Sequence, residues 1–128
     1  MVVDTSAFLA ILFREPEADL FTIAIRSATT RVISVASVLE AAIVVQRRFE
    51  RCDDIDPLIE ELPLELIPVD FDQIRWARYA FETYGRGRHP ARLNFGDCFS
   101  YALAKATGEP LLFKGNDFSH TDLAAVIL

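Results

Sequence analysis

Short apolar segments alternate with longer segments of helical periodicity along this chain, and that alternation restricts the possible folds most strongly. The predicted strands comprise residues 1–4, 31–35, 64–69, 111–113 and 124–128. The predicted helices comprise residues 7–13, 15–28, 37–51, 53–63, 71–84 and 94–107. Strands that alternate with helices typically form parallel sheets covered on both faces. We therefore expect an α/β fold with a central, mainly parallel sheet of about five strands, as a single domain over residues 1–128.

Local sequence signals refine this expectation at two helices. Thr5 or Ser6 is expected to cap the first helix, and Ser37 is expected to cap the third. In the second helix, Leu20 and Ile23 belong to an apolar face at helical spacing.

The composition limits the class of protein. Hydrophobic residues make up 52% of the 128 residues, which supplies the core of one domain. No apolar run approaches the roughly 20 residues that span a bilayer, and the N-terminus lacks the pattern of a secretion signal, so a cytoplasmic protein is expected. The net charge of −6 argues against nucleic-acid binding through general positive charge. It does not exclude a nuclease, because carboxylates gathered around a cation also make a chain acidic.

The two cysteines, Cys52 and Cys98, are too few for a disulfide framework and have no spacing typical of a zinc site. Cys98 lies in an apolar segment and is expected to be a small buried hydrophobic residue.

Four acidic residues lie close to the ends of predicted strands. Asp4 ends the first strand, and Glu40 lies in the first turns of the helix after the second. Asp97 lies in the first turn of the helix before the fourth strand, and Asp117 follows that strand. Sites in parallel α/β sheets form beyond the carboxyl ends of the strands, so we expect these acids to converge. Their mutual repulsion requires a cation, and oxygen ligands suit Mg²⁺ or Mn²⁺.

Each of these acids also has a purely structural explanation. Glu40 and Asp97 each fit the last position of a capping box. Asp117 fits a turn, and Asp4 fits a strand end or a helix cap. The occurrence of all four together favours the metal site.

The acidic motifs resemble those of PIN-domain ribonucleases, and most closely those of the VapC toxins of prokaryotic toxin–antitoxin pairs. The motifs in chain order are Asp4-Thr5-Ser6, Ser37-x-x-Glu40, Asn94-Phe95-Gly96-Asp97-Cys98 and Lys114-Gly115-Asn116-Asp117-Phe118. Any one motif is weak evidence, whereas the ordered set covers nearly the whole chain. The resemblance implies a PIN-like fold and Mg²⁺-dependent endonucleolytic cleavage of RNA.

The resemblance also assigns roles to individual residues. Asp4 and Asp97 match the principal metal-binding aspartates of the family, Glu40 and Asp117 match its third and fourth acids, and Asp122 is a possible fifth. Three polar residues are expected to hold the ligands or a metal-bound water by hydrogen bonds without binding the metal themselves: Thr5, Ser6 and Asn116. The number of metal ions, and direct metal contacts by Asp117 or Asp122, stay open. The alternatives are helix caps for Thr5 and Ser6 and a helix or strand flank for Asp122.

Basic residues must hold the RNA backbone near an acidic pocket. The expected contacts are Arg86, Arg88, Arg92 and Lys114. An ordinary solvated loop would also explain residues 85–92. The second basic patch, at residues 47, 48 and 51, is explained by a solvated helix face.

The high apolar content fits a homodimer, and the resemblance implies an antitoxin partner whose tail covers the acidic pocket, with an Arg that pairs with the carboxylates. Two alternatives to the ribonuclease are a nuclease-like binding module without catalysis and another Mg²⁺-dependent phosphoryl-transfer enzyme. The first strand lacks the Asp-x-Asp sequence of one such phosphatase class, which argues against the second alternative.

Overall fold

Four parallel strands form the central sheet of the protein. The computed structural model describes residues 1–49 and 55–128. The strands are β1 (Val2–Val3), β2 (Val32–Ser34), β3 (Glu65–Ile67) and β4 (Leu111–Leu112), in the order β3-β2-β1-β4. In the central strand β1, Val2 lies opposite Val32 of β2 on one side and opposite Leu111 of β4 on the other. These three parallel strands therefore end at the same edge of the sheet.

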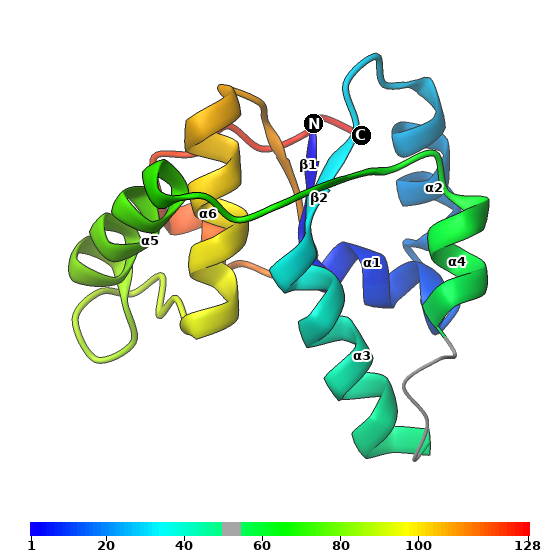
Figure 1. Cartoon of the computed structure of the whole chain (residues 1–128), viewed down its shortest axis with the longest axis horizontal. Helices are drawn as coiled ribbons and strands as arrows, with labels where there is room; N and C mark the ends of the chain where they lie inside the picture. The colour runs from blue at the N-terminus through cyan, green and yellow to red at the C-terminus, as the bar shows by residue number, and fades with distance from the viewer. Residues whose placement is uncertain (50–54) are drawn as a thin grey trace.

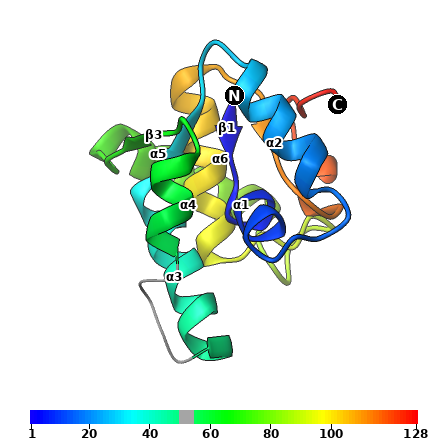
Figure 2. The same ribbon diagram turned by 90° about the vertical axis from the view of Figure 1, so that its right-hand side faces the viewer.

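Six α-helices and one 3₁₀ helix accompany the sheet in the described residues. They are α1 (Thr5–Leu12), α2 (Ala18–Ser27), α3 (Val35–Phe49), α4 (Asp56–Glu61), α5 (Phe71–Tyr84), α6 (Phe95–Thr107) and the 3₁₀ helix η2 (Asp117–His120). Figures 1 and 2 show α1, α2 and α4 on one side of the sheet and α5 and α6 on the other, while α3 extends away from the end of β2. None of the described helices combines the length and apolar character that crossing a membrane requires.

Alternate residues of the strands enter two separate hydrophobic clusters. Val3 and Ile33 pack with the helices α1 to α4, and Val2 and Val32 pack with α5 and α6. All four side chains are buried. This two-sided burial is the property expected of a parallel sheet, and it confirms the predicted α/β class with helices on both faces.

The predicted fifth strand is wrong. Residues 124–128 make only one isolated bridge to β4, between Ala125 and Leu111. Two backbone hydrogen bonds join Ala124 and Val126 to Leu111, but Ile127 and Leu128 are exposed, so the pairing does not extend into a strand.

Two helix starts and one helix face also differ from the prediction. Asp4 caps α1, and the helix therefore already includes Thr5 and Ser6. Helix α3 begins at Val35, so Ser37 lies inside its first turn instead of capping it. In α2, the predicted face is wrong, because Leu20 and Ile23 are 56% and 62% exposed.

The buried face of α2 carries Phe21 and Ile25, which lie four residues apart. Both pack into the hydrophobic cluster that contains Val3 and Ile33. The predicted end of α3 at Arg51, and Cys52, lie outside the described residues.

Candidate active site

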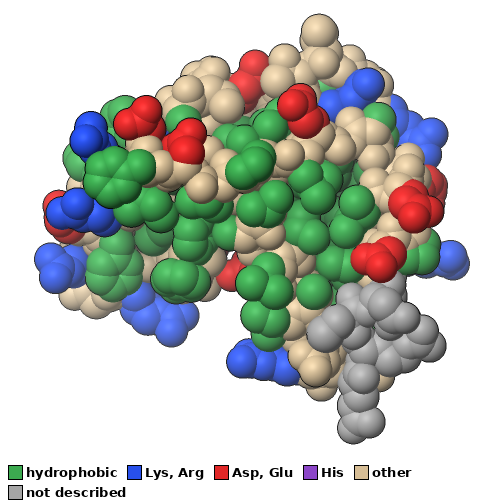
Figure 3. All heavy atoms as spheres, viewed as in Figure 1, with side chains coloured by type: hydrophobic (Ala, Val, Ile, Leu, Met, Phe, Trp, Pro, Cys, Tyr) green, Lys and Arg blue, Asp and Glu red, His purple; other side chains and the backbone are tan. Residues whose placement is uncertain are grey.

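A cleft of about 650 Å³ opens at the edge of the sheet where β1 and β2 end. Its walls come from α1, α3 and the first turns of α6, and three of the predicted acids line it: Asp4, Glu40 and Asp97. Figure 3 shows the notch at the lower edge of the molecule, with hydrophobic side chains on both walls and basic side chains on its outer rims. Three acids from distant parts of the chain therefore line one cleft.

Asp4 is the best-anchored carboxylate of the cleft. It is only 3% exposed. Its Oδ2 accepts hydrogen bonds from the backbone N–H of Ser6 (2.9 Å) and the hydroxyl of Ser6 (2.6 Å). Its Oδ1 accepts the hydroxyl of Ser100 at 2.5 Å. Asp4 thus caps α1 and is held in one orientation at the same time. Ser6 holds this carboxylate by hydrogen bonds from both its backbone and its hydroxyl.

Asp97 occupies the capping box predicted for α6. The backbone N–H of Asp97 donates to Asn94 Oδ1, and the backbone N–H of Asn94 donates to Asp97 Oδ2, each at 2.9 Å. Burial nevertheless raises the pKa of Asp97 to about 7, against the hydrogen bond from Asn94, which lowers it. The negative charges of Asp4, Glu40 and Asp117 raise this pKa further, so uncompensated carboxylates surround Asp97.

Glu40 reaches across from α3 and lies directly on the backbone of Gly96 in α6. A β-carbon placed on Gly96 would lie 1.5 Å from Glu40 Oε2, so no other residue fits at position 96 without displacing this carboxylate. Burial raises the pKa of Glu40, a hydrogen bond with Thr5 lowers it, and the charge of Asp4 raises it further. Thr5 therefore supports the acidic cluster through Glu40.

Asp117 and Asp122 differ in their relation to the cleft. Asp117 lies on the exposed helix η2, outside the lining of the cleft, but its charge acts on Asp97. The preceding Lys114 ties this segment to the site, because its backbone N–H donates to Ser6 Oγ at 2.9 Å. Asn116 is exposed and its side chain makes no capping hydrogen bond to η2.

Asp122 lies against a later part of α6. It accepts hydrogen bonds from the hydroxyl of Tyr101 (2.9 Å) and from Lys105 Nζ (2.5 Å). Burial would raise the pKa of Asp122, but the hydrogen bonds from Lys105 and Tyr101 lower it overall. A carboxylate already paired with Lys105 has no need of a metal ion, and the geometry does not support a fifth ligand here.

The predicted basic contacts also separate into two groups. Arg86, Arg88 and Arg92 are exposed on the loop between α5 and α6, which leads into the first turn of α6. The ammonium group of Lys114 instead lies 2.6 Å from Glu15 and 3.1 Å from Glu17. In this arrangement Lys114 fastens the segment after β4 to the α1–α2 connection and does not face the cleft.

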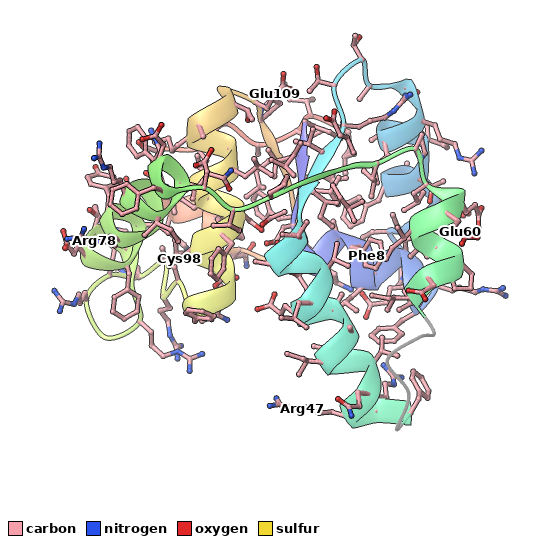
Figure 4. All side chains as sticks on the ribbon, in the orientation of Figure 1. Phe8, Arg47, Glu60, Arg78, Cys98 and Glu109 are labelled. Atoms are coloured by element: carbon pink, nitrogen blue, oxygen red, sulfur yellow. The ribbon has the colours of Figure 1, made fainter. Side chains whose placement is uncertain are left out.

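Sequence reasoning assigned no functional part to Arg47, Gly96 or Ser100. Arg47 lines the outer end of the cleft, and Figure 4 shows its side chain pointing from the end of α3 toward the space beside α6. The neighbouring Arg48 instead lies over the ring of Phe13, at 4.5 Å from its centroid. A glycine in the first turn of a helix is an available signal for a close approach. Helical spacing is a signal for Arg47, which lies seven residues after Glu40 and therefore on the same face of α3, unlike Arg48.

The donor chemistry of the cleft suits a hard divalent cation. Its charged ligand groups are the carboxylates of Asp4, Glu40 and Asp97, without a thiol or imidazole. A cation would relieve the repulsion that raises the pKa of Asp97. Among residues 1–49 and 55–128, no three acidic, His or Cys side chains already converge as the ligands of one ion would. The residues therefore fit Mg²⁺ or Mn²⁺ by their chemistry, and binding requires the side chains to close around the ion.

Comparison with known proteins agrees with this geometry. The PIN domain family matches residues 1–123. VapC ribonuclease Mb0640 of Mycobacterium bovis is 49% identical over 130 residues, covering 100% of this chain and 99% of the relative. The crystal structure of Mycobacterium tuberculosis VapC20, described as a sarcin–ricin loop cleaving toxin, has a TM-score of 0.73 at 19% identity and covers 98% of this chain and 97% of its own. A toxin–antitoxin complex from Klebsiella pneumoniae contains a chain with a TM-score of 0.72 at 14% identity, with 98% and 95% covered.

The two solved structures share the fold of this chain, and the Mycobacterium bovis relative is similar to it in sequence over the full length. The chain therefore belongs to the PIN-domain family, and within it to the VapC ribonucleases.

Proposed function

We propose that this protein is a metal-dependent endoribonuclease and the toxin of a VapBC-type toxin–antitoxin pair. The observation that carries the proposal is the cleft lined by Asp4, Glu40 and Asp97. Burial and the neighbouring carboxylates raise the pKa of Asp97 there. The ribonuclease named at 49% identity over the whole chain supports RNA as the substrate.

The acidic residues in and beside the cleft would have different roles in cleavage. Asp4 and Asp97 would hold Mg²⁺ or Mn²⁺, which when bound makes water a better nucleophile and neutralises charge on the phosphate. Asp4 is already oriented by Ser6 and Ser100. Asp97 would have to give up its proton to bind, and Glu40, which lies on Gly96, would orient the attacking water. Asp117 acts through its charge on Asp97 and is a candidate for a second ion.

The same cleft is suited to an inhibitory partner. Its acidic inner end is continued by apolar walls that include Leu39, Ile43 and Phe99. A peptide segment with apolar side chains and one Arg would fill the walls and pair with the carboxylates. The related fold in the toxin–antitoxin complex from Klebsiella pneumoniae supports a partner of this kind, a cognate VapB-type antitoxin.

A second copy of the chain is the proposed occupant of a neighbouring groove between α5 and α6. The groove has a volume of about 500 Å³ and an almost wholly apolar lining, and it borders the cleft at Phe95, which is 80% exposed. Arg78 and Glu82 lie one turn apart at this groove. Two-fold symmetry would bring the Arg of each copy against the Glu of the other, which makes the surface complementary to itself.

Substitution of either principal acid is expected to abolish cleavage. Asp4→Asn and Asp97→Asn remove a metal-binding charge while retaining size, so we expect RNA cleavage to fall at least about 100-fold in Mg²⁺. EDTA should stop the wild-type protein equally. The control Asp72→Asn changes an exposed acid of α5 and should cut at the wild-type rate. Wild-type rates for both cleft variants would refute the assignment, and hydrolysis of simple phosphate esters in place of RNA would favour another phosphoryl-transfer enzyme.

The metal-free protein should become less stable as the pH rises from 4 to 8. With a pKa of about 7 in the folded state and 3.8 as its ordinary value, Asp97 keeps its proton on folding in a range where the unfolded chain has lost it. The stability that Asp97 contributes by keeping its proton is therefore present at low pH and is lost as the pH rises through 7. Asp97→Asn should raise the free energy of unfolding at pH 8 by about 1–3 kcal/mol in urea titrations. An unchanged pH profile in Asp97→Asn, with Asp72→Asn as the control, would contradict the prediction.

Positive charges near the cleft should govern RNA affinity. In EDTA, which prevents cleavage, Arg86→Glu with Arg88→Glu should weaken RNA binding and reduce the slope of log K against log salt by about one or more. Arg47→Glu should act in the same direction because its side chain lines the cleft. The neighbouring Arg48→Glu is the matched control, since that side chain packs on Phe13. Equal effects at positions 47 and 48 would show that only net charge matters.

A charge in the α5–α6 groove should separate the proposed dimer. Phe81 is 44% exposed and lines the groove, so Phe81→Glu should give a monomer in sedimentation equilibrium without unfolding the chain. Phe71→Glu provides the control, because Phe71 is also exposed on α5 but lies outside the groove. If Phe81→Glu sediments as the wild-type dimer does, this face is not the interface.

A further inference from the structure

Two buried serines lie beneath the acidic cleft and connect the elements that carry its carboxylates. Ser100 on α6 is 0% exposed and Ser37 on α3 is 2% exposed. The hydroxyl of Ser100 donates to Asp4 Oδ1 at 2.5 Å, and the two serine hydroxyl oxygens are 3.3 Å apart. A continuous polar path thus joins α3, α6 and the end of β1.

The direction of these hydrogen bonds follows from the charge of Asp4. An ionised carboxylate can only accept, so the hydroxyl hydrogen of Ser100 points to Asp4. The oxygen of Ser100 is then free to accept the hydrogen of Ser37. A hydroxyl polarised in this way is a stronger donor, so Ser37 acts on Asp4 through Ser100.

Each serine lies three residues from an acid on its own helix, before the acid on α3 and after it on α6. Ser37 precedes Glu40 by three residues on α3, and Ser100 follows Asp97 by three residues on α6. Residues three apart on a helix are neighbours on one face. The contact between the serines therefore joins α3 to α6 one turn from Glu40 and Asp97, and the contact between Ser100 and Asp4 joins α6 to the end of β1.

The packing of these positions does not itself require hydroxyl groups. Alanine occupies the same volume less one oxygen and favours helix, whereas a buried hydroxyl costs free energy unless it is hydrogen-bonded. Thr5 lies against the same arrangement, because its hydroxyl oxygen is 3.4 Å from the carbonyl oxygen of Ser37.

We propose that Ser100, assisted by Ser37, is a positioning residue that orients Asp4 and fixes the spacing of the three cleft carboxylates for a divalent cation. This inference rests on the proposed metal-dependent function. It adds two residues that touch neither substrate nor metal and act through Asp4.

The test is calorimetric titration of the purified protein with Mn²⁺ alone. Ser100→Ala should weaken Mn²⁺ binding about 10-fold or more, the size of effect seen when a group that orients a metal ligand is removed. Ser37→Ala should weaken it less. The double variant should bind about as weakly as Ser100→Ala alone, because Ser37 acts only through Ser100.

A matched control separates this role from a general effect of burying a smaller side chain. Ser34 is also 0% exposed, but its hydroxyl accepts only the backbone N–H of Ala36 at 3.2 Å. Ser34→Ala should therefore bind Mn²⁺ as the wild type does. Thermal unfolding without metal should show Ser100→Ala folded. If Ser100→Ala does not fold, the Mn²⁺ affinities of Ser37→Ala and Ser34→Ala are compared instead. Weaker binding in Ser37→Ala alone supports the positioning role, and equal binding contradicts it.

The outcomes separate this inference from the proposed function. Wild-type Mn²⁺ affinity in Ser100→Ala, together with loss of binding in Asp97→Asn, would overturn the positioning role and leave the metal site intact. Equal binding in wild type and Asp97→Asn, or none in the wild type, would overturn the metal site and the positioning role with it. Additive losses in the double serine variant would contradict the path from Ser37 through Ser100.

Discussion

Repulsion between carboxylates at the end of a parallel sheet is the constraint around which this structure is built. The central strand β1 ends at Asp4, and the helices α3 and α6 bring Glu40 and Asp97 to the same cleft. The backbone positions of these acids are fixed by the elements that carry them, so only side-chain rotation can change their spacing. Burial raises the pKa of Asp97 and of Glu40, and the neighbouring carboxylates raise it further; the packing of the two hydrophobic clusters must offset this cost.

The helix-capping and metal-binding interpretations of the acids turn out to be compatible. Asp97 completes a capping box and Asp4 caps α1, so each acid stabilises a helix start by its backbone contacts. The same contacts fix each side chain toward the cleft. Because a helix start favours negative charge, capping also favours the ionised carboxylate that a cation requires. The two alternatives that the sequence left open for these residues are therefore one arrangement.

The sequence predicted the helices and the four strands of the sheet well because their apolar periodicity is local. It failed for residues 124–128, where an apolar run looks like a strand but finds a partner only at Ala125. It also failed for the face of α2, because Leu20 and Phe21 satisfy helical spacing equally well and only tertiary packing decides between them. In the cleft, the acids were predictable from their places at strand ends and from the family resemblance.

The support of Asp4 by the nearby Ser6 was predictable, but that of Ser100 and Gly96 was not, because it depends on contacts between elements that are distant in sequence. Ser100 lies 96 residues from Asp4, and Gly96 matters because Glu40 arrives from another helix. Lys114 illustrates the converse, since a basic residue beside a predicted ligand is paired with Glu15 and Glu17.

Charge placement reconciles an acidic chain with an anionic substrate. The net charge is −6, and RNA would be repelled by a uniformly acidic surface. Here the acids are concentrated at the inner end of one cleft, where burial keeps Asp97 partly protonated and a cation would neutralise the rest. Positive charge is placed outside that cluster, at Arg47 on the outer end of the cleft and at Arg86 and Arg88 on the loop before α6. Under the proposed function, a phosphate backbone would approach over these basic residues and would meet the carboxylates only where a cation lies between them.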